Sequence, residues 1–189
     1  MNELEHYIQT YFGVTKDDIK TIENLFTLSY LQKGEYFLSQ DTYCQKLSFI
    51  KSGCLRVYAN TEDKEVTQWI SSDGSFITDL SSLIFETPSR FSIQALTDTE
   101  LYTIHKENYL KIGRLVPRWH ELEKLFIAKC FTMLEDRMFR HLSMSAEDRY
   151  DYFFNQNPTL FIQVPLQYIA SMLGMTPETF SRIRKKRLS

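Results

Sequence analysis

The sequence predicts an α+β protein made of an N-terminal β-roll with flanking helices, a long helix, and a C-terminal pair of short helices. Two observations predict this. Residues 28–105 consist of short β-rich runs separated by polar turns, the pattern of an all-β roll or barrel. Residues 117–142 and the end of the chain instead repeat apolar side chains at helical spacing. We therefore expect three parts: a β-roll domain (1–116), the long helix (117–142) and a helical domain (143–189).

Charge is unevenly distributed along the chain. The formal net charge of the 189 residues is only −2, but residues 160–189 carry five bases against the single acid Glu178. That segment is therefore +4 and residues 1–159 are −6. A basic end on an acidic body predicts an anionic partner that is met by one part of the molecule.

The spacing of the cysteines and the hydropathy of the chain argue against a metal-binding or a membrane-spanning protein. Cys44, Cys54 and Cys130 stand far apart with no CxxC pair, so they indicate reduced intracellular thiols rather than a metal site. Neither a signal peptide nor an apolar run of membrane-spanning length is visible, so we expect a cytoplasmic protein without a membrane partner. The scattered histidines give no metal-ligand spacing, and we propose no metal.

The N-terminal part begins with helix and changes to strand. Residues 2–26 are expected to be helical, with Thr15 as an N-cap before apolar residues at helical spacing. From residue 28 the helical repeat of apolar side chains gives way to short β-rich runs. Each of these glycines falls in a polar turn: Gly34, Gly53 and Gly74. This spacing favours the β-roll.

The long helix is apolar on more than one side. Its apolar residues are Trp119, Leu122, Leu125, Phe126, Cys130, Phe131, Met133, Leu134, Met138 and Leu142. A helix with two apolar surfaces has more to cover than its own domain, which predicts a homodimer through Trp119–Leu142. An ordinary helix buried within one chain is the alternative, because a wide apolar face alone does not prove association.

The C-terminal part predicts three helices. Ser145 is a good N-cap for a helix that reaches Phe154. A second helix begins with Pro165 at its first position and ends at Gly174, which supplies a left-handed turn. Thr176 can cap the third helix, whose first position is a proline. Such a tight pair forms a helix–turn–helix.

The spacing fits the DNA-binding version of this motif. Ala170 allows a close helix crossing, Gly174 allows the sharp turn, and Met175, Phe180 and Ile183 supply the apolar contacts. The second helix would then present a polar, mostly basic face to double-stranded DNA. The expected DNA-binding residues are Thr176, Glu178, Thr179, Ser181, Arg182, Lys185 and Lys186.

The charged side chains on that face have expected roles in DNA binding. Glu178 can accept a hydrogen bond from cytosine N4, and Arg182 can donate to guanine O6 and N7. Lys185 and Lys186, with the neighbouring arginines, would position the helix through phosphate contacts. The same residues would also suit any helix, because an acid at its N-terminus and bases at its C-terminus complement its dipole.

The order of parts, ending in GMTPETFSRIRKK, resembles the Crp/Fnr family of bacterial transcription regulators over essentially the whole chain. The resemblance implies a cyclic-nucleotide-binding-like jelly roll, dimerisation through the long helix, and base contacts by Glu178 and Arg182. RNA polymerase is a candidate further partner. Pro177 stands where relatives that bind the catabolite operator carry arginine, which implies a different operator. Only Leu188 and Ser189 follow the basic run, so no β-hairpin wing is expected.

The effector cassette departs from the family pattern. By the resemblance, effector contacts fall on Thr78, Asp79, Leu80, Ser89 and Arg90. Thr78 stands for the family's glycine, Asp79 for its glutamate and Ser89 for its arginine. Arg90 comes one residue late, and a one-residue slip on a strand turns a side chain to the other face, although a bulge could restore it. A different effector, or none, is therefore favoured over a cyclic nucleotide, and no cofactor is expected.

Two other classes of function are alternatives to DNA binding. The helix–turn–helix could contact a protein partner instead of DNA, because charge alone does not distinguish the two. An enzyme is not expected, since the sequence has no catalytic residues in the form of a nucleophile with a paired base, and no phosphate-cradling glycine loop.

Overall fold

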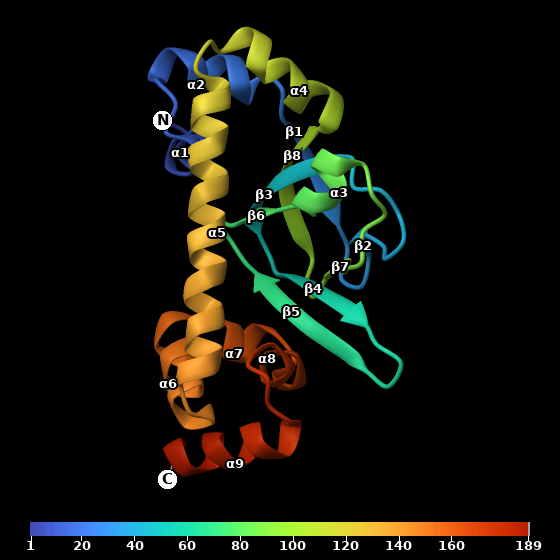
Figure 1. Cartoon of the computed structure of the whole chain (residues 1–189), viewed down its shortest axis with the longest axis vertical. Coiled ribbons are helices and arrows are strands. Elements are labelled where there is room, and N and C mark those ends of the chain that lie inside the picture. The colour runs from blue at the N-terminus through green and yellow to red at the C-terminus, as the bar shows by residue number, and fades with distance from the viewer. Residues whose placement is uncertain (189) are drawn as a thin grey trace.

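The computed structural model describes residues 1–188 and is organised along one long helix (Figure 1). Helix α5 (Trp119–Ser143) joins the N-terminal helices and the β-roll at one end to the C-terminal helices at the other. The remaining helices are α1 (Glu3–Phe12), α2 (Lys16–Glu23), α3 (Leu80–Phe85), α4 (Lys106–Leu115), α6 (Ala146–Gln156), α7 (Leu160–Gln163), α8 (Leu166–Met172) and α9 (Pro177–Leu188). The strands are β1 (Thr27–Leu31), β2 (Tyr36–Leu38), β3 (Lys46–Ser52), β4 (Leu55–Asn60), β5 (Glu65–Ser71), β6 (Phe76–Ile77), β7 (Ser92–Ala95) and β8 (Thr99–His105).

The β-roll consists of two antiparallel sheets of four strands each, in the orders β1-β8-β3-β6 and β2-β7-β4-β5. Gly53 sits in the turn between β3 and β4 with φ of 102°, a left-handed conformation that L side chains rarely adopt. A Cβ atom built there would lie 2.5 Å from the Thr99 hydroxyl oxygen. This turn therefore requires glycine for both its backbone angle and its close packing.

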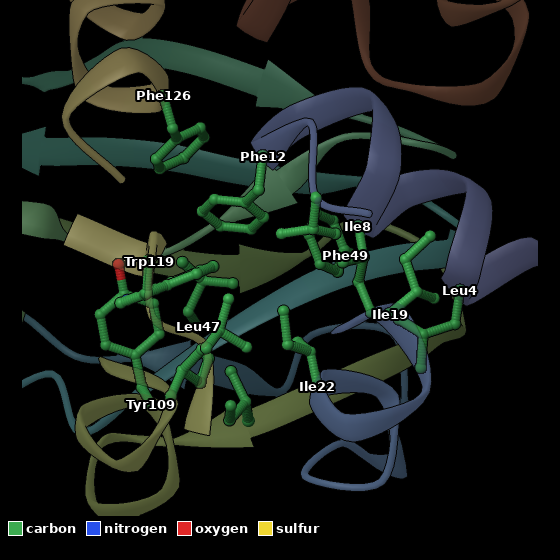
Figure 2. Packing of buried hydrophobic residues seen from close by; sticks show 14 of the residues in the cluster. Leu4, Ile8, Phe12, Ile19, Ile22, Leu47, Phe49, Tyr109, Trp119 and Phe126 are labelled. Carbon is green, nitrogen blue, oxygen red and sulfur yellow. The ribbon is translucent and has the colours of Figure 1, made fainter. Parts of the chain in front are cut away.

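The start of α5 is held by an aromatic core (Figure 2). Phe126 and Trp119 of α5 are buried, and their rings lie 4.7 Å and 4.8 Å from that of Phe12 in α1. Phe49 of β3 packs into the same cluster. The cluster joins α1, α2, α4, α5 and one sheet, so the first half of α5 is fixed against the roll.

The C-terminal helices are also packed against the roll. Their core includes Cys54, Ile70 and Leu96 of the β-roll together with Tyr150 and Phe180 of α6 and α9. Helix α8 lies along β5, and helix α9 lies at the end of the molecule farthest from α2 and α4 (Figure 1). The orientation of the helix–turn–helix is thus set by contacts with the β-roll.

Polar contacts reinforce this docking. The Thr67 amide of β5 donates a 3.0 Å hydrogen bond to the Ser171 hydroxyl of α8. Arg56 of β4 is buried, pairs with Glu65 at 2.6 Å, and places its guanidinium 3.8 Å from the centre of the Tyr168 ring. A cation against an aromatic ring adds attraction when both are desolvated.

Several predicted boundaries need correction. Residues 2–26 form two helices because Gly13 ends α1 in a left-handed conformation and Thr15 caps α2 anew. Helix α6 runs to Gln156, two residues beyond the predicted Phe154. Pro165 is the N-cap of α8, not its first helical residue. The sequence analysis did not predict three of the shorter helices, α3, α4 and α7. The prediction that no β-hairpin wing follows α9 falls on Ser189, which lies outside the described residues.

Candidate nucleic-acid interface and effector cavity

The turn between α8 and α9 has the geometry that the sequence predicts. Gly174 adopts φ of 69°, and the Met175 amide donates to the Ala170 carbonyl at 2.9 Å, which closes the turn. Ala170 and Phe180 are buried where the two helices meet. The Thr179 amide donates to the Thr176 hydroxyl at 3.2 Å, so Thr176 caps α9 as expected.

Helix α9 buries one face and exposes the other. Phe180 and Ile183 are buried in the C-terminal core. Of the predicted DNA-binding residues, Thr179 is half-buried, and the exposed ones are Thr176, Glu178, Ser181, Arg182, Lys185 and Lys186. Hydrogen bonds from its own backbone amide and from the Thr176 hydroxyl lower the pKa of Glu178, which keeps its carboxylate ionised as an acceptor.

The basic residues of α9 divide into two groups. Lys186 lies 3.1 Å from a Glu147 carboxylate oxygen, and Arg187 forms a 2.5 Å ion pair with Asp151. Both acids belong to α6, so these two bases help attach α9 to its neighbour. No described carboxylate forms an ion pair with Arg182, Arg184 or Lys185. The bases nearest the start of α9 are therefore those most open to an anionic partner.

A cavity of about 370 Å³, which we call the apolar cavity, lies between the β-roll and α5. Its apolar walls are Tyr11, Val57, Trp69, Phe76, Ile77, Leu80, Phe91, Ile93, Met133 and Leu134. Its polar lining is Gln68, Ser71, Ser75, Thr78, Asp79, Ser81, Cys130 and Arg137. Asp79 and Arg137 are the charged members of this described lining.

The predicted effector residues are only partly brought together. Thr78, Asp79 and Leu80 line the apolar cavity, whereas Ser89 and Arg90 are not among its lining residues. The Ser89 hydroxyl is buried and donates to the Asp79 carboxylate at 2.6 Å.

Asp79 and Arg90 also have roles in the local structure. The Asp79 carboxylate accepts from the Ser82 amide at 3.0 Å and so caps α3. Arg90 is exposed, with its guanidinium 4.7 Å from the centre of the Phe91 ring. The lining of the apolar cavity thus contains the Asp79 carboxylate, at the position where the family pattern has an acid. Neither Ser89 nor Arg90 supplies a cation to this lining.

Comparisons with known proteins agree with this architecture. The family model described as a cyclic nucleotide-binding domain matches residues 28–114. A putative transcriptional regulator of the Crp/Fnr family from Eubacterium rectale is 19% identical, with a TM-score of 0.71 over 96% of this chain and 87% of that chain. FixK2 from Bradyrhizobium japonicum is 18% identical, with a TM-score of 0.74 over 85% of this chain and 83% of its own. The chain has the Crp/Fnr fold.

A third structure is similar over nearly the full length. The c-di-GMP responsive global regulator CLP of Xanthomonas campestris is 16% identical, with a TM-score of 0.70 and coverage of 92% of both chains. No curated protein matches the sequence. The predicted α+β class and the resemblance to Crp/Fnr regulators are confirmed at the level of the fold, and residues 28–114 match the cyclic nucleotide-binding domain model.

In this Crp/Fnr fold α5 leaves a row of apolar side chains exposed from Ile127 onward. We call this row the apolar stripe: Ile127 (43% exposed), Phe131 (62%), Leu134 (53%), Met138 (62%) and Leu142 (80%). Spacings of four, three, four and four residues place its members on one side of the helix. Leu134 belongs to both the stripe and the apolar cavity.

Residues that the sequence analysis missed complete the apolar cavity. Trp69 of β5 and Arg137 of α5 lie together, with the guanidinium 4.8 Å from the centre of the indole ring. Burial and the nearby Arg140 lower the pKa of Arg137. No local pattern pairs residues this far apart in the chain, so only the packing of α5 on the roll reveals them.

The described residues contain neither a membrane-spanning helix nor a cluster of metal ligands. None of the described helices is long and apolar enough to cross a membrane. Within the same residues, no group of three or more histidine, cysteine, aspartate or glutamate side chains could hold a metal ion.

Proposed function

We propose that the protein is a sequence-specific, DNA-binding transcription regulator of the Crp/Fnr type that acts in the cytoplasm. The exposed face of α9 carries this proposal. It places Glu178 and Arg182 one helical turn apart on a helix whose opposite face is buried. A carboxylate and a guanidinium at this spacing can accept from cytosine N4 and donate to guanine O6 and N7.

The apolar stripe supports a homodimer. Five large apolar side chains in a row on a helix form a seam that a second copy can cover, because an isologous interface brings the same residues together. Pairing two α5 helices would present two α9 helices to the same duplex. Half-sites of a near-palindromic operator then lie roughly one DNA turn apart.

The first experiment is selection of binding sites from a pool of random duplexes with the purified full chain. We expect enrichment of a two-fold symmetric sequence with half-sites roughly 10 bp apart. Arg182→Ala should lose preference at one base pair in each half-site and bind the selected duplex at least tenfold more weakly. Arg114→Ala is the matched control, because Arg114 is exposed on α4 at the other end of the molecule.

The outcomes separate DNA recognition from other uses of the same helix. Equal loss with Arg114→Ala would mean that only overall charge matters. A pool without enrichment, tested across a range of salt concentrations, would contradict the proposal. In that case α9 would be better explained as a contact surface for a protein partner.

We further propose that the apolar cavity is the effector site of this regulator and that it does not hold a cyclic nucleotide. Aromatic and aliphatic side chains form most of its wall, and Asp79 would oppose a phosphate. The test is calorimetric titration with cyclic AMP and cyclic GMP. No heat is expected at micromolar concentrations, whereas micromolar binding would contradict the exclusion of a cyclic nucleotide.

A further inference from the structure

A second cavity of about 340 Å³ lies where α5 meets the C-terminal helices. Its walls come from α5, α6, β5 and the end of α8. Four basic side chains line it: Arg137, Arg140 and His141 from α5, and Arg149 from α6. None of the described lining residues is aspartate or glutamate. We call it the basic cavity, and its lining contrasts with the net charge of −2 of the whole chain.

Part of this basic lining has a structural role. Arg149 donates to the Leu173 carbonyl at 3.1 Å and to the Met144 carbonyl at 2.8 Å. Arg137 donates to the Met172 carbonyl at 3.3 Å. These bonds satisfy carbonyls at the C-terminal ends of α5 and α8. A carbonyl is an acceptor but not a counter-ion, so the positive charge of both guanidiniums persists.

Arg140 has no such structural partner. Its guanidinium lies 4.8 Å from the centre of the Tyr152 ring, and no described residue is its hydrogen-bond or ion-pair partner. Burial together with Arg137 and Arg149 lowers the pKa of the neighbouring His141. The field inside the basic cavity is therefore positive and uncompensated by the described groups.

We propose that the basic cavity binds a small multivalent oxyanion, the phosphoryl or carboxylate groups of a metabolite. Guanidinium groups match the geometry of both, because they donate two parallel hydrogen bonds to the oxygens of one group. The side-chain amides of Gln156 and Asn157 add neutral donors to the lining. The volume lies at the lower end of the range for ligand sites, which favours a compact ion.

The site is placed to influence the helix–turn–helix. His141 packs against Gly174, since a Cβ atom built on that glycine would lie 3.3 Å from the imidazole Nε2. Arg137 and Arg149 hold the last carbonyls of α8, immediately before the same turn. An occupant of the basic cavity thus stabilises the present orientation of α8 and α9. This influence on DNA binding rests on the proposed function, whereas anion binding itself does not.

The test is calorimetric titration of the full chain with inorganic pyrophosphate and with citrate, at constant ionic strength set by chloride. We expect saturable binding of one ion per chain and a rise in melting temperature. Arg140→Gln should weaken binding at least tenfold, because it removes the cation that has no structural partner. Arg114→Gln removes the same charge from exposed α4 and should bind like the parent protein.

Each outcome supports or overturns the proposal. Pyrophosphate binding without citrate binding would assign phosphoryl groups, and the reverse result would assign carboxylates. The absence of saturable heat with both ions, or equal binding by Arg140→Gln and the parent protein, would overturn it. If Arg140→Gln fails to fold, Arg140→Lys provides a second variant: it keeps the charge but loses the two parallel donors, so it should also weaken binding. Because no DNA is present, a failed operator selection leaves this result unaffected.

Discussion

The two halves of α5 have different surroundings. In the first half, Trp119 and Phe126 are buried in the aromatic core that one chain makes for itself. In the second half, Phe131, Met138 and Leu142 are more than 60% exposed. The same helix therefore starts as part of a folding core and continues as an apolar surface that is left uncovered in one chain. This difference separates residues that hold the monomer together from those available for partners.

The largest effect is expected from truncating an aromatic side chain in the first half. Phe126→Ala should lower the free energy of unfolding by about 3–5 kcal/mol, because it leaves a cavity among packed rings. Urea unfolding followed by circular dichroism measures this. Phe131→Ala deletes the same side chain from an exposed site and should change the stability of the monomer by less than about 0.5 kcal/mol. Similar losses in both variants would contradict the division of α5.

A somewhat smaller effect is expected on self-association. Phe131→Glu would place a charge in the seam of the proposed dimer and should raise its dissociation constant by about 100-fold or more. Sedimentation velocity over a range of protein concentrations measures the change. Asp136→Asn changes the charge of an exposed residue outside the apolar stripe and serves as the control. A parent protein that stays monomeric at high concentration would show that the stripe has another use.

The docking of α8 on the roll can be weakened without touching either half of α5. Ser171→Ala removes the acceptor of the Thr67 amide and should cost about 1 kcal/mol of stability. Faster hydrogen exchange of the Thr67 amide should accompany the loss. Ser143→Ala is the control, because the Ser143 hydroxyl is exposed and bonds only within its own helix, to the Phe139 carbonyl. Unchanged exchange at Thr67 would mean that other contacts hold α8 in place.

The smallest effect is a pH dependence at the end of α5. Burial, Arg137 and Arg149 lower the pKa of His141 below its ordinary value of 6.5. The unfolded chain then binds more protons than the folded one near that pH, so the free energy of unfolding should fall as pH decreases from 7.5 to 5.5. Unfolding of His141→Gln at both pH values should show a smaller fall. His6→Gln is the matched control, because His6 is exposed, and it should show the same fall as the parent. An equal fall in His141→Gln and the parent would contradict the assignment of this pH dependence to His141.

Local sequence rules account well for the parts of the fold that one segment determines. Thr15 and Ser145 were expected as N-caps and are, because capping depends only on the next three residues. Gly174 was expected at a left-handed turn for the same kind of reason. Helix α4 could not be predicted because only two of its residues, Tyr109 and Ile112, are buried, which leaves a weak helical repeat of apolar side chains.

Features that depend on distant segments could not be predicted in this way. Lys186 was expected to contact phosphate, yet it also pairs with Glu147, an acid that lies 39 residues earlier in the chain. Arg137 and Trp69 come together only through the packing of α5 on the roll. The candidate DNA-binding face could therefore be predicted from the sequence of one helix. The linings of both cavities could be identified only from the tertiary structure.

Arg137 forms part of the wall of both cavities. One face of its guanidinium lies over Trp69, and one of its N–H groups is bonded to the Met172 carbonyl. If an occupant on either side moves this side chain, the shape and charge of the other chamber change with it. Thermodynamic linkage then requires that each occupant alter the affinity of the other by the same factor. Arg137 would then couple the affinities of the two cavities, although they lie on different sides of its side chain.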